Sequence, residues 1–122
     1  MRFTSTLKKN YEFKRLYNKG KSAASQCAVV YCRRNGGPDN RLGVTVSTKI
    51  GGAVQRNRVR RRLKEIYRLN ENILQRGYDI VIVARVRSRY AGYREIEASV
   101  LSAFRKLNIC VQNAQTPKVG DK

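Results

Sequence analysis

Apolar residues recur in the middle of this chain at the spacing of an amphipathic α-helix. Between residues 53 and 70 they stand at Val59, Leu63 and Ile66, in steps of four and three, with Tyr67 beside them. A stripe of this kind packs against a core. The pattern therefore predicts a helix that lies along one side of a small domain.

The opposite side of this predicted helix is strongly basic. Glu65 is the only acid between residues 49 and 68, and repulsion among like charges on one face opposes helix formation. Runs of like charge are often disordered tails, but the apolar stripe favours a folded helix whose charge a polyanion neutralises. At about 100° per residue, the solvent-facing residues are Asn57, Arg60, Arg61, Lys64 and Arg68, with Arg58 and Arg62 at the flanks.

Three other segments have the alternating or apolar pattern of strands. The stretch 21–34 reads as one strand, and the turn sequence NGGPDN at 35–40 separates it from a second strand at 41–49. A third segment, 78–85, is apolar on both faces. Such a pattern is typical of a central strand covered on both sides.

The N-terminal segment predicts a short helix. Residues 1–9 read as extended, and Asn10 is a good N-cap for a helix at 11–18. Phe13 and Tyr17 stand four residues apart, so they share one face of this helix.

The C-terminal part predicts one more helix. An amphipathic pattern spans 93–107, and the polar segment 112–122 reads as a disordered tail. The pattern thus predicts one α+β domain at 1–111 in the order α-β-β-α-β-α. The last helices are expected to cover one face of its sheet.

Charge narrows the class of partner. The 122 residues include 27 Lys and Arg against 8 Asp and Glu, a formal charge of +19 and a pI of about 10.7. This excess indicates nucleic acid or an anionic membrane surface. No apolar run approaches the roughly 20 residues of a membrane span, and the N-terminus lacks the apolar region of a signal peptide. We expect a cytoplasmic protein without a membrane partner.

The sequence offers no arrangement of side chains for protein-based catalysis. It contains no histidine, the commonest general base and metal ligand. Its acids are scattered over separate predicted elements, which argues against a two-metal nuclease site. Cys27, Cys32 and Cys110 are odd in number and form no C-x-x-C pair, so neither a disulfide framework nor a zinc site is expected. We predict no catalytic residue and no metal ligand in the protein.

Two features besides the basic helix indicate binding. Phe13, Tyr17 and Tyr31 would form an aromatic platform on which unpaired bases stack without a demand on sequence. From pattern alone, core packing is the better interpretation of Phe13, and for the two tyrosines both interpretations are equally good. The second feature is one side of the strand at 41–49, formed by Thr45, Ser47 and Lys49. This side either contacts phosphates or simply faces solvent.

Motifs in a fixed order along residues 5–108 resemble one known family. The strongest reads A-V-x-R-N-R-x-R-R at 53–61, followed by K-E-x-Y-R at 64–68. Supporting matches are L-K at 7–8, E-F at 12–13, L-G at 42–43, V-S at 46–47 and G-Y-D-I-V at 77–81. Together they resemble the protein subunit of bacterial ribonuclease P, the ribonucleoprotein that removes the 5′ leader from precursor tRNA. Thr48 and Gly52 depart from the family, in which basic or amide residues are common at these positions.

This resemblance implies a fold and two RNA partners. The fold is an α+β sandwich of about four strands and three helices, in the order α-β-β-β-α-β-α, with a left-handed βαβ crossover; the general rule predicts the opposite hand. The RNA subunit performs a Mg²⁺-dependent hydrolysis, and no further protein is obligatory. The basic helix contacts this catalytic RNA, and the residues implied are Arg56, Asn57, Arg58, Arg60, Arg61, Lys64 and Arg68.

The resemblance also implies a cleft between the first helix and the sheet that holds the single-stranded leader of precursor tRNA. Phe13 then belongs to this cleft, which reverses its interpretation from pattern alone. The leader-binding residues implied are Phe13, Lys14, Tyr17, Val29, Tyr31, Thr45, Ser47 and Lys49.

Two other classes of protein remain open at this level. A ribosomal or general RNA-binding protein would share the charge and the α+β fold, but it would show no preference for a precursor leader. A protein nuclease acting alone would cut RNA without an RNA partner, and the scattered acids and absent histidine argue against it.

Overall fold

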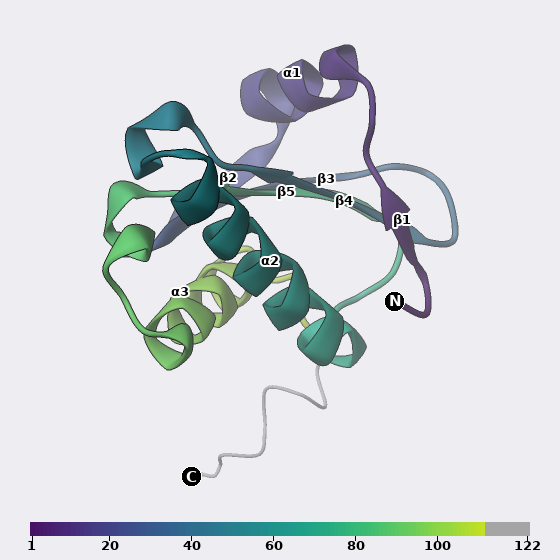
Figure 1. Cartoon of the computed structure of the whole chain (residues 1–122). Coiled ribbons are helices and arrows are strands. Elements are labelled where there is room, and N and C mark those ends of the chain that lie inside the picture. Colours follow the sequence, from purple (N-terminus) through teal and green to yellow (C-terminus); the bar gives the residue numbers. More distant parts are fainter. Residues whose placement is uncertain (112–122) are drawn as a thin grey trace, which may run out of the picture.

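The computed structural model describes residues 1–111, which form three layers around one mixed sheet (Figure 1). Helix α1 covers one face of the sheet, and α2 and α3 cover the other. The helices are α1 (Asn10–Lys19), α2 (Ala53–Asn70) and α3 (Tyr93–Lys106). The strands are β1 (Thr4–Thr6), β2 (Lys21–Ala24), β3 (Ala28–Arg34), β4 (Asn40–Thr45) and β5 (Tyr78–Ala84). The tail predicted at 112–122 lies outside the described residues.

The strands follow the order β1-β4-β5-β3-β2, so β5 lies at the centre of the sheet. It pairs antiparallel with β3 and parallel with β4, and β1 adds to β4 in parallel. This position explains its two apolar faces, because Ile80 and Ile82 pack toward α2 and α3 while Val81 packs under α1. The β4-α2-β5 unit joins two neighbouring parallel strands and is the crossover that the resemblance implies. The left-handed sense of this crossover stays a prediction.

The apolar stripe of α2 is buried as predicted. Val59, Leu63, Ile66 and Tyr67 are each at most 2 % exposed and belong to the main core between the sheet, α2 and α3. A second, smaller cluster lies under α1, where Phe13 and Tyr31 pack against buried aliphatic side chains. The inward side of α3 joins the main core through Ile96, Val100, Ala103, Phe104 and Leu107.

The prediction of a single strand at 21–34 is wrong, because two strands occupy this stretch. Ser25 turns the chain, because its backbone N–H and its hydroxyl both donate to the carbonyl of Ala28, at 2.8 and 3.0 Å. β2 and β3 then pair as an antiparallel hairpin. The sheet has five strands where the resemblance implies about four, and α1 covers a second face where the pattern predicted cover on one.

Two predicted boundaries also differ from the structure. The strand expected at 41–49 ends at Thr45, and Ser47 accepts a hydrogen bond from the backbone N–H of Lys49 at 3.3 Å. This contact begins a short 3-10 helix, η1 (Thr48–Ile50), that leads toward α2. The N-cap of α1 is Lys9 rather than Asn10.

A buried carboxylate holds the N-terminal strand. Glu71 begins the short 3-10 helix η2 (Glu71–Ile73) and is only 2 % exposed. It accepts hydrogen bonds from the backbone N–H of Arg2 at 2.7 Å and of Phe3 at 3.1 Å, and from the Thr4 hydroxyl at 2.5 Å. Burial by itself would raise the pKa of Glu71, but these hydrogen bonds and the N-terminal ammonium lower it below its ordinary value.

Replacing Glu71 with glutamine is expected to change how stability depends on pH. A lowered folded-state pKa stabilises the fold above the unfolded pKa, near 4.5, and this contribution is lost as pH falls through the folded pKa. Glu71→Gln should lower the free energy of unfolding at neutral pH by about 1–3 kcal/mol and should lose less stability on acidification. Denaturant unfolding of both proteins across acidic pH measures this. The same pH dependence in both would rule out this role of Glu71.

Candidate nucleic-acid interface

The outward side of α2 carries the basic surface that the sequence predicts. Arg58, Arg61 and Lys64 are exposed. Arg60 donates from Nη1 to Oδ1 of Asn57 at 3.0 Å, which orients its guanidinium along the helix. A hollow of about 440 Å³ opens on this side and is lined by Val54, Asn57, Arg60, Arg61 and Lys64.

Three other cations of α2 are less free to bind a partner. Arg68 donates to both carboxylate oxygens of Glu65 at 2.9 and 2.7 Å, and this pair raises the pKa of Arg68 and lowers that of Glu65. Arg56 is half-buried. Arg62 donates from Nη1 to the carbonyl of Ala91 at 3.3 Å and so ties α2 to the loop before α3. The cations of α2 best placed for a partner are therefore Arg58, Arg61 and Lys64.

A groove of about 470 Å³ runs between α1 and the end of β4. The ring of Tyr17 packs edge-on against Tyr31, with centroids 5.0 Å apart and planes at 73°. The hydroxyl of Tyr17 is hydrogen-bonded to that of Thr45 at 2.9 Å, which joins α1 to β4. The residues that line the groove are Asn10, Phe13, Lys14, Tyr17, Val44, Thr45, Val46 and Arg60.

Gly43 makes room for the ring of Phe13. A Cβ at position 43 would lie 2.6 Å from two carbons of that ring, far inside the optimal carbon–carbon separation. The ring therefore lies directly on the backbone of β4. Phe13 lines both the groove and a further hollow beside β1.

The structure brings only part of the predicted leader-binding set into the groove. Tyr31 lies against Tyr17, and Val29 is half-buried two residues away on the same face of β3. Ser47 and Lys49 lie beyond the end of β4, at η1, and are not among the groove's lining residues within 1–111. The predicted residues that do line it are Phe13, Lys14, Tyr17 and Thr45.

Arg60 has a second position that sequence reasoning missed. It was predicted only for the surface of α2, yet it lines the groove, the hollow on α2 and the hollow beside β1. Asn10, Val44 and Val46 were missed as well. The position of Arg60 depends on how the crossover places α2 along β4, so no local sequence signal indicates it. Through Arg60 the groove and the basic surface are continuous.

An ion-pair network fixes α1 over the sheet. Arg41 on β4 donates from Nε and Nη2 to the carboxylate of Asp79 at 2.8 and 2.7 Å, and from Nη1 to Glu12 on α1. The hydrogen bond to Asp79 is the main cause of a raised pKa of Arg41. Within residues 1–111, no three side chains of Cys, Asp or Glu lie close enough together to hold a metal ion.

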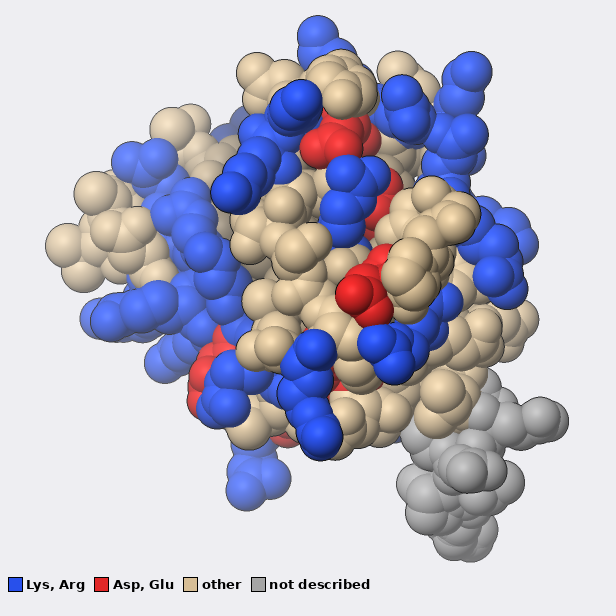
Figure 2. All heavy atoms as spheres, turned by 90° about the vertical axis from the view of Figure 1, so that its right-hand side faces the viewer, with Lys and Arg blue, Asp and Glu red and all other residues tan. Residues whose placement is uncertain are grey.

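Positive charge covers the molecule well beyond α2. Figure 2 shows Lys and Arg side chains around the end of the molecule that carries β1, with small groups of acidic side chains between them. Along the described chain, no helix is both long and apolar enough to cross a bilayer. A basic helix and an aromatic groove on a domain with a small mixed sheet are typical of α+β proteins that bind RNA.

Comparison with known proteins identifies the family. The family model described as Ribonuclease P matches residues 1–108. The ribonuclease P protein component of Alkaliphilus oremlandii is 43 % identical over 109 residues, which cover 89 % of this chain and 96 % of the relative. That of Clostridioides difficile is 41 % identical over 88 % of this chain and 96 % of its own length.

Solved structures agree with this match. The RNase P protein of Staphylococcus aureus superposes with a TM-score of 0.79 at 31 % identity, covering 85 % of this chain and 95 % of that one. The RNase P protein of Thermotoga maritima gives a TM-score of 0.74 at 29 % identity, covering 80 % and 93 %. The chain therefore belongs to the ribonuclease P protein family, which binds RNA and acts in tRNA processing, and the resemblance found in its motifs is confirmed.

Proposed function

We propose that this chain binds two RNA molecules within ribonuclease P. The basic surface of α2 binds the catalytic RNA, and the groove beside α1 holds the single-stranded 5′ leader of precursor tRNA. The catalytic RNA, with the Mg²⁺ ions that it holds, hydrolyses the bond that releases the leader. The protein contributes binding and orientation and lowers the concentration of Mg²⁺ that cleavage requires.

The position of Arg60 is the observation that carries this proposal. It lines both the groove and the hollow on α2, so one arginine side chain is shared by the two proposed RNA sites. A strand in the groove therefore passes from α1 to the surface of α2 along cationic side chains. This arrangement supports a protein that holds a leader next to the RNA that cuts it.

The groove suits an unpaired strand of varied sequence. Phe13 and Tyr17 offer aromatic rings on which bases stack, and stacking makes little demand on base identity. Lys14 and Arg60 lie at its sides, where they attract phosphates. These contacts would favour precursor tRNA over mature tRNA, which has no leader to place there.

The cations of α2 suit a folded RNA. The planar guanidinium group binds phosphate through two parallel hydrogen bonds, and its charge persists at every physiological pH. Cations that neutralise phosphates relieve repulsion that metal ions would otherwise have to screen. A lower Mg²⁺ requirement of the assembled enzyme follows.

Cleavage of precursor tRNA across a range of Mg²⁺ concentrations tests the proposal. The mixtures contain the protein alone, the cognate catalytic RNA alone, or both. We expect cleavage only where the catalytic RNA is present, at lower Mg²⁺ when the protein is added. A protein that leaves the Mg²⁺ requirement unchanged would instead fit a general RNA-binding role, and cleavage by the protein alone would make it a nuclease.

A further inference from the structure

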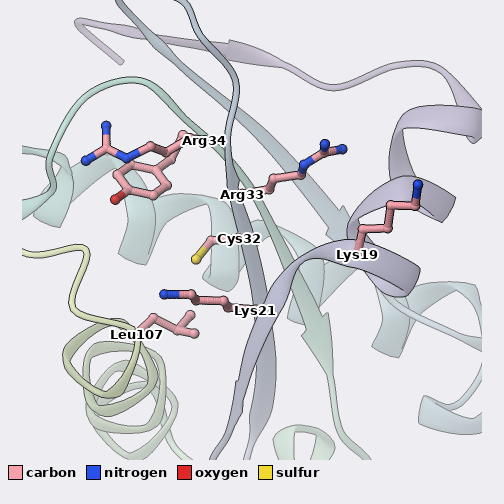
Figure 3. A pocket seen from close by; sticks show the side chains of 7 residues that line it. Lys19, Lys21, Cys32, Arg33, Arg34 and Leu107 are labelled. Carbon is pink, nitrogen blue, oxygen red and sulfur yellow. The ribbon is translucent and has the colours of Figure 1, made fainter.

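Four cations gather away from the groove and from α2, where α1 and β3 end (Figure 3). Lys19 lies in the last turn of α1, Lys21 begins β2, and Arg33 and Arg34 end β3. They line a pocket of about 260 Å³, which shares no lining residue with the groove or with the hollow on α2. Its other lining residues are Cys32, Tyr78 and Leu107.

The charge of this pocket is not compensated within residues 1–111. None of its four cations forms an ion pair with a described acid. Glu12 and Asp79 line a neighbouring pocket with Arg33 and Arg34, but both carboxylates are bound to Arg41. The positive charge of the pocket is therefore available to an anionic partner.

The pocket is also preorganised for an anion. The guanidinium carbon of Arg34 lies 5.1 Å from the centroid of the Tyr78 ring, a cation–π contact that holds the guanidinium in place. Cys32 and Leu107 are buried beneath, and low-dielectric walls strengthen the attraction of nearby cations for an anion.

The spacing of the cations fits a phosphate chain better than a single small anion. Figure 3 shows Lys19 and Arg33 on one side of β3, and Lys21 and Arg34 on the other. β2 is the edge strand of the sheet, so a chain that bends round this edge passes cations on both faces. A single-stranded nucleic acid carries one charge per nucleotide and is flexible enough to follow such a path.

The pocket begins close to the groove, at the C-terminal end of α1. Tyr17 lines the groove, and Lys19, two residues further along the helix, lines the pocket. Two residues of helix rise by about 3 Å but turn by about 200°, so Lys19 lies on another face of α1 than Tyr17. A strand that leaves the groove at Tyr17 reaches Lys19 and Lys21 by bending round the end of α1.

We propose that Lys19, Lys21, Arg33 and Arg34 bind phosphates of the upstream part of the precursor tRNA leader, beyond the nucleotides in the groove. This inference rests on the proposed function, because it takes the groove as the site of the first leader nucleotides. The pocket makes binding depend on leader length, independently of leader sequence.

Binding of precursors with short and long leaders tests this pocket. The wild type and the double variant Lys21→Gln, Arg34→Gln are each assembled with the catalytic RNA. Leaders of about 4 and about 16 nucleotides bracket the usual site sizes of single-strand-binding grooves. The variant should bind the long-leader precursor about ten-fold more weakly and the short-leader precursor equally well. The salt dependence of long-leader binding should fall by about 0.7 in slope for each lost contact.

A matched variant controls for net charge. Arg94→Gln with Arg105→Gln removes two charges from the exposed side of α3 and should leave both precursors unaffected. No loss on the long leader, or an equal loss on short leaders, long leaders and mature tRNA, would overturn the pocket proposal. Failure of the underlying function would look different, since the wild type would then bind short-leader precursor and mature tRNA equally well.

Discussion

Replacing Arg61 and Lys64 with glutamine is expected to weaken binding of the catalytic RNA about thirty-fold at 0.15 M monovalent salt. Both side chains are exposed in the middle of α2 and line its hollow. Each phosphate contact contributes about 0.9 to the slope of log affinity against log salt, so two contacts account for about 1.5 log units between 0.15 M and 1 M salt. The slope of the variant should be smaller by about 1.8.

Equilibrium binding of the catalytic RNA across salt concentrations measures this effect. The double variant Arg94→Gln, Arg105→Gln carries the same net charge and is the control, because its cations lie on α3. Equal losses in the two variants would show that overall charge, rather than the surface of α2, binds the catalytic RNA.

Replacing Tyr31 with alanine is expected to weaken binding of precursor tRNA by about 1–3 kcal/mol, the usual contribution of one base stacked on an aromatic ring. The ring of Tyr31 supports, at a centroid distance of 5.0 Å, the ring of Tyr17, which lines the proposed leader site. Mature tRNA has no leader in the groove, so its affinity should change little.

Tyr31→Phe is the matched control for this prediction. It keeps the ring that stacks and that packs under α1, and it removes only the hydroxyl. Binding of precursor and mature tRNA to the assembled enzyme separates the outcomes. An equal loss for both RNAs with alanine would mean that Tyr31 supports the fold or the complex as a whole, and would refute the groove as the leader site.

Long periodic segments of this fold were predictable from the sequence. The helix predicted at 53–70 has the bounds of α2, and its apolar stripe from Val59 to Tyr67 repeats over about two and a half turns. The apolar run of β5 and the amphipathic pattern of α3 were equally clear, since a central strand and a core-facing helix each have a pattern of their own.

Short elements were not predictable in the same way. The hairpin of β2 and β3 turns at Ser25 without a glycine or an Asn-Gly pair, so the alternating pattern of the sequence is not interrupted there. β1 has three residues, and its position depends on β4 and Glu71, which lie far along the chain. Local pattern carries no information about such partners.

The site was predictable by residue type more than by arrangement. The cations of α2 and the aromatic residues of α1 are visible in the sequence, and the family motifs assign them to two RNA partners. The junction at Arg60 depends on the crossover that places α2 along β4, and periodicity does not reveal it. The pocket at the end of α1 depends on the hairpin that was missed. This hairpin pairs Lys21 with Cys32 and so brings the two lysines of the pocket close to Arg33 and Arg34.

The N-terminal strand leaves the ribosome long before the residues that hold it. Thr4 pairs with Asn40, and its hydroxyl binds a carboxylate 67 positions later in the chain. Contacts of such long sequence separation form late in folding, because the closure of a long loop must precede them. Until η2 has been made, the outer edge of β4 lacks its neighbour, and an unpaired edge is a template for association with other chains. The first of the five strands is thus held by a contact that exists only once η2 has been synthesised.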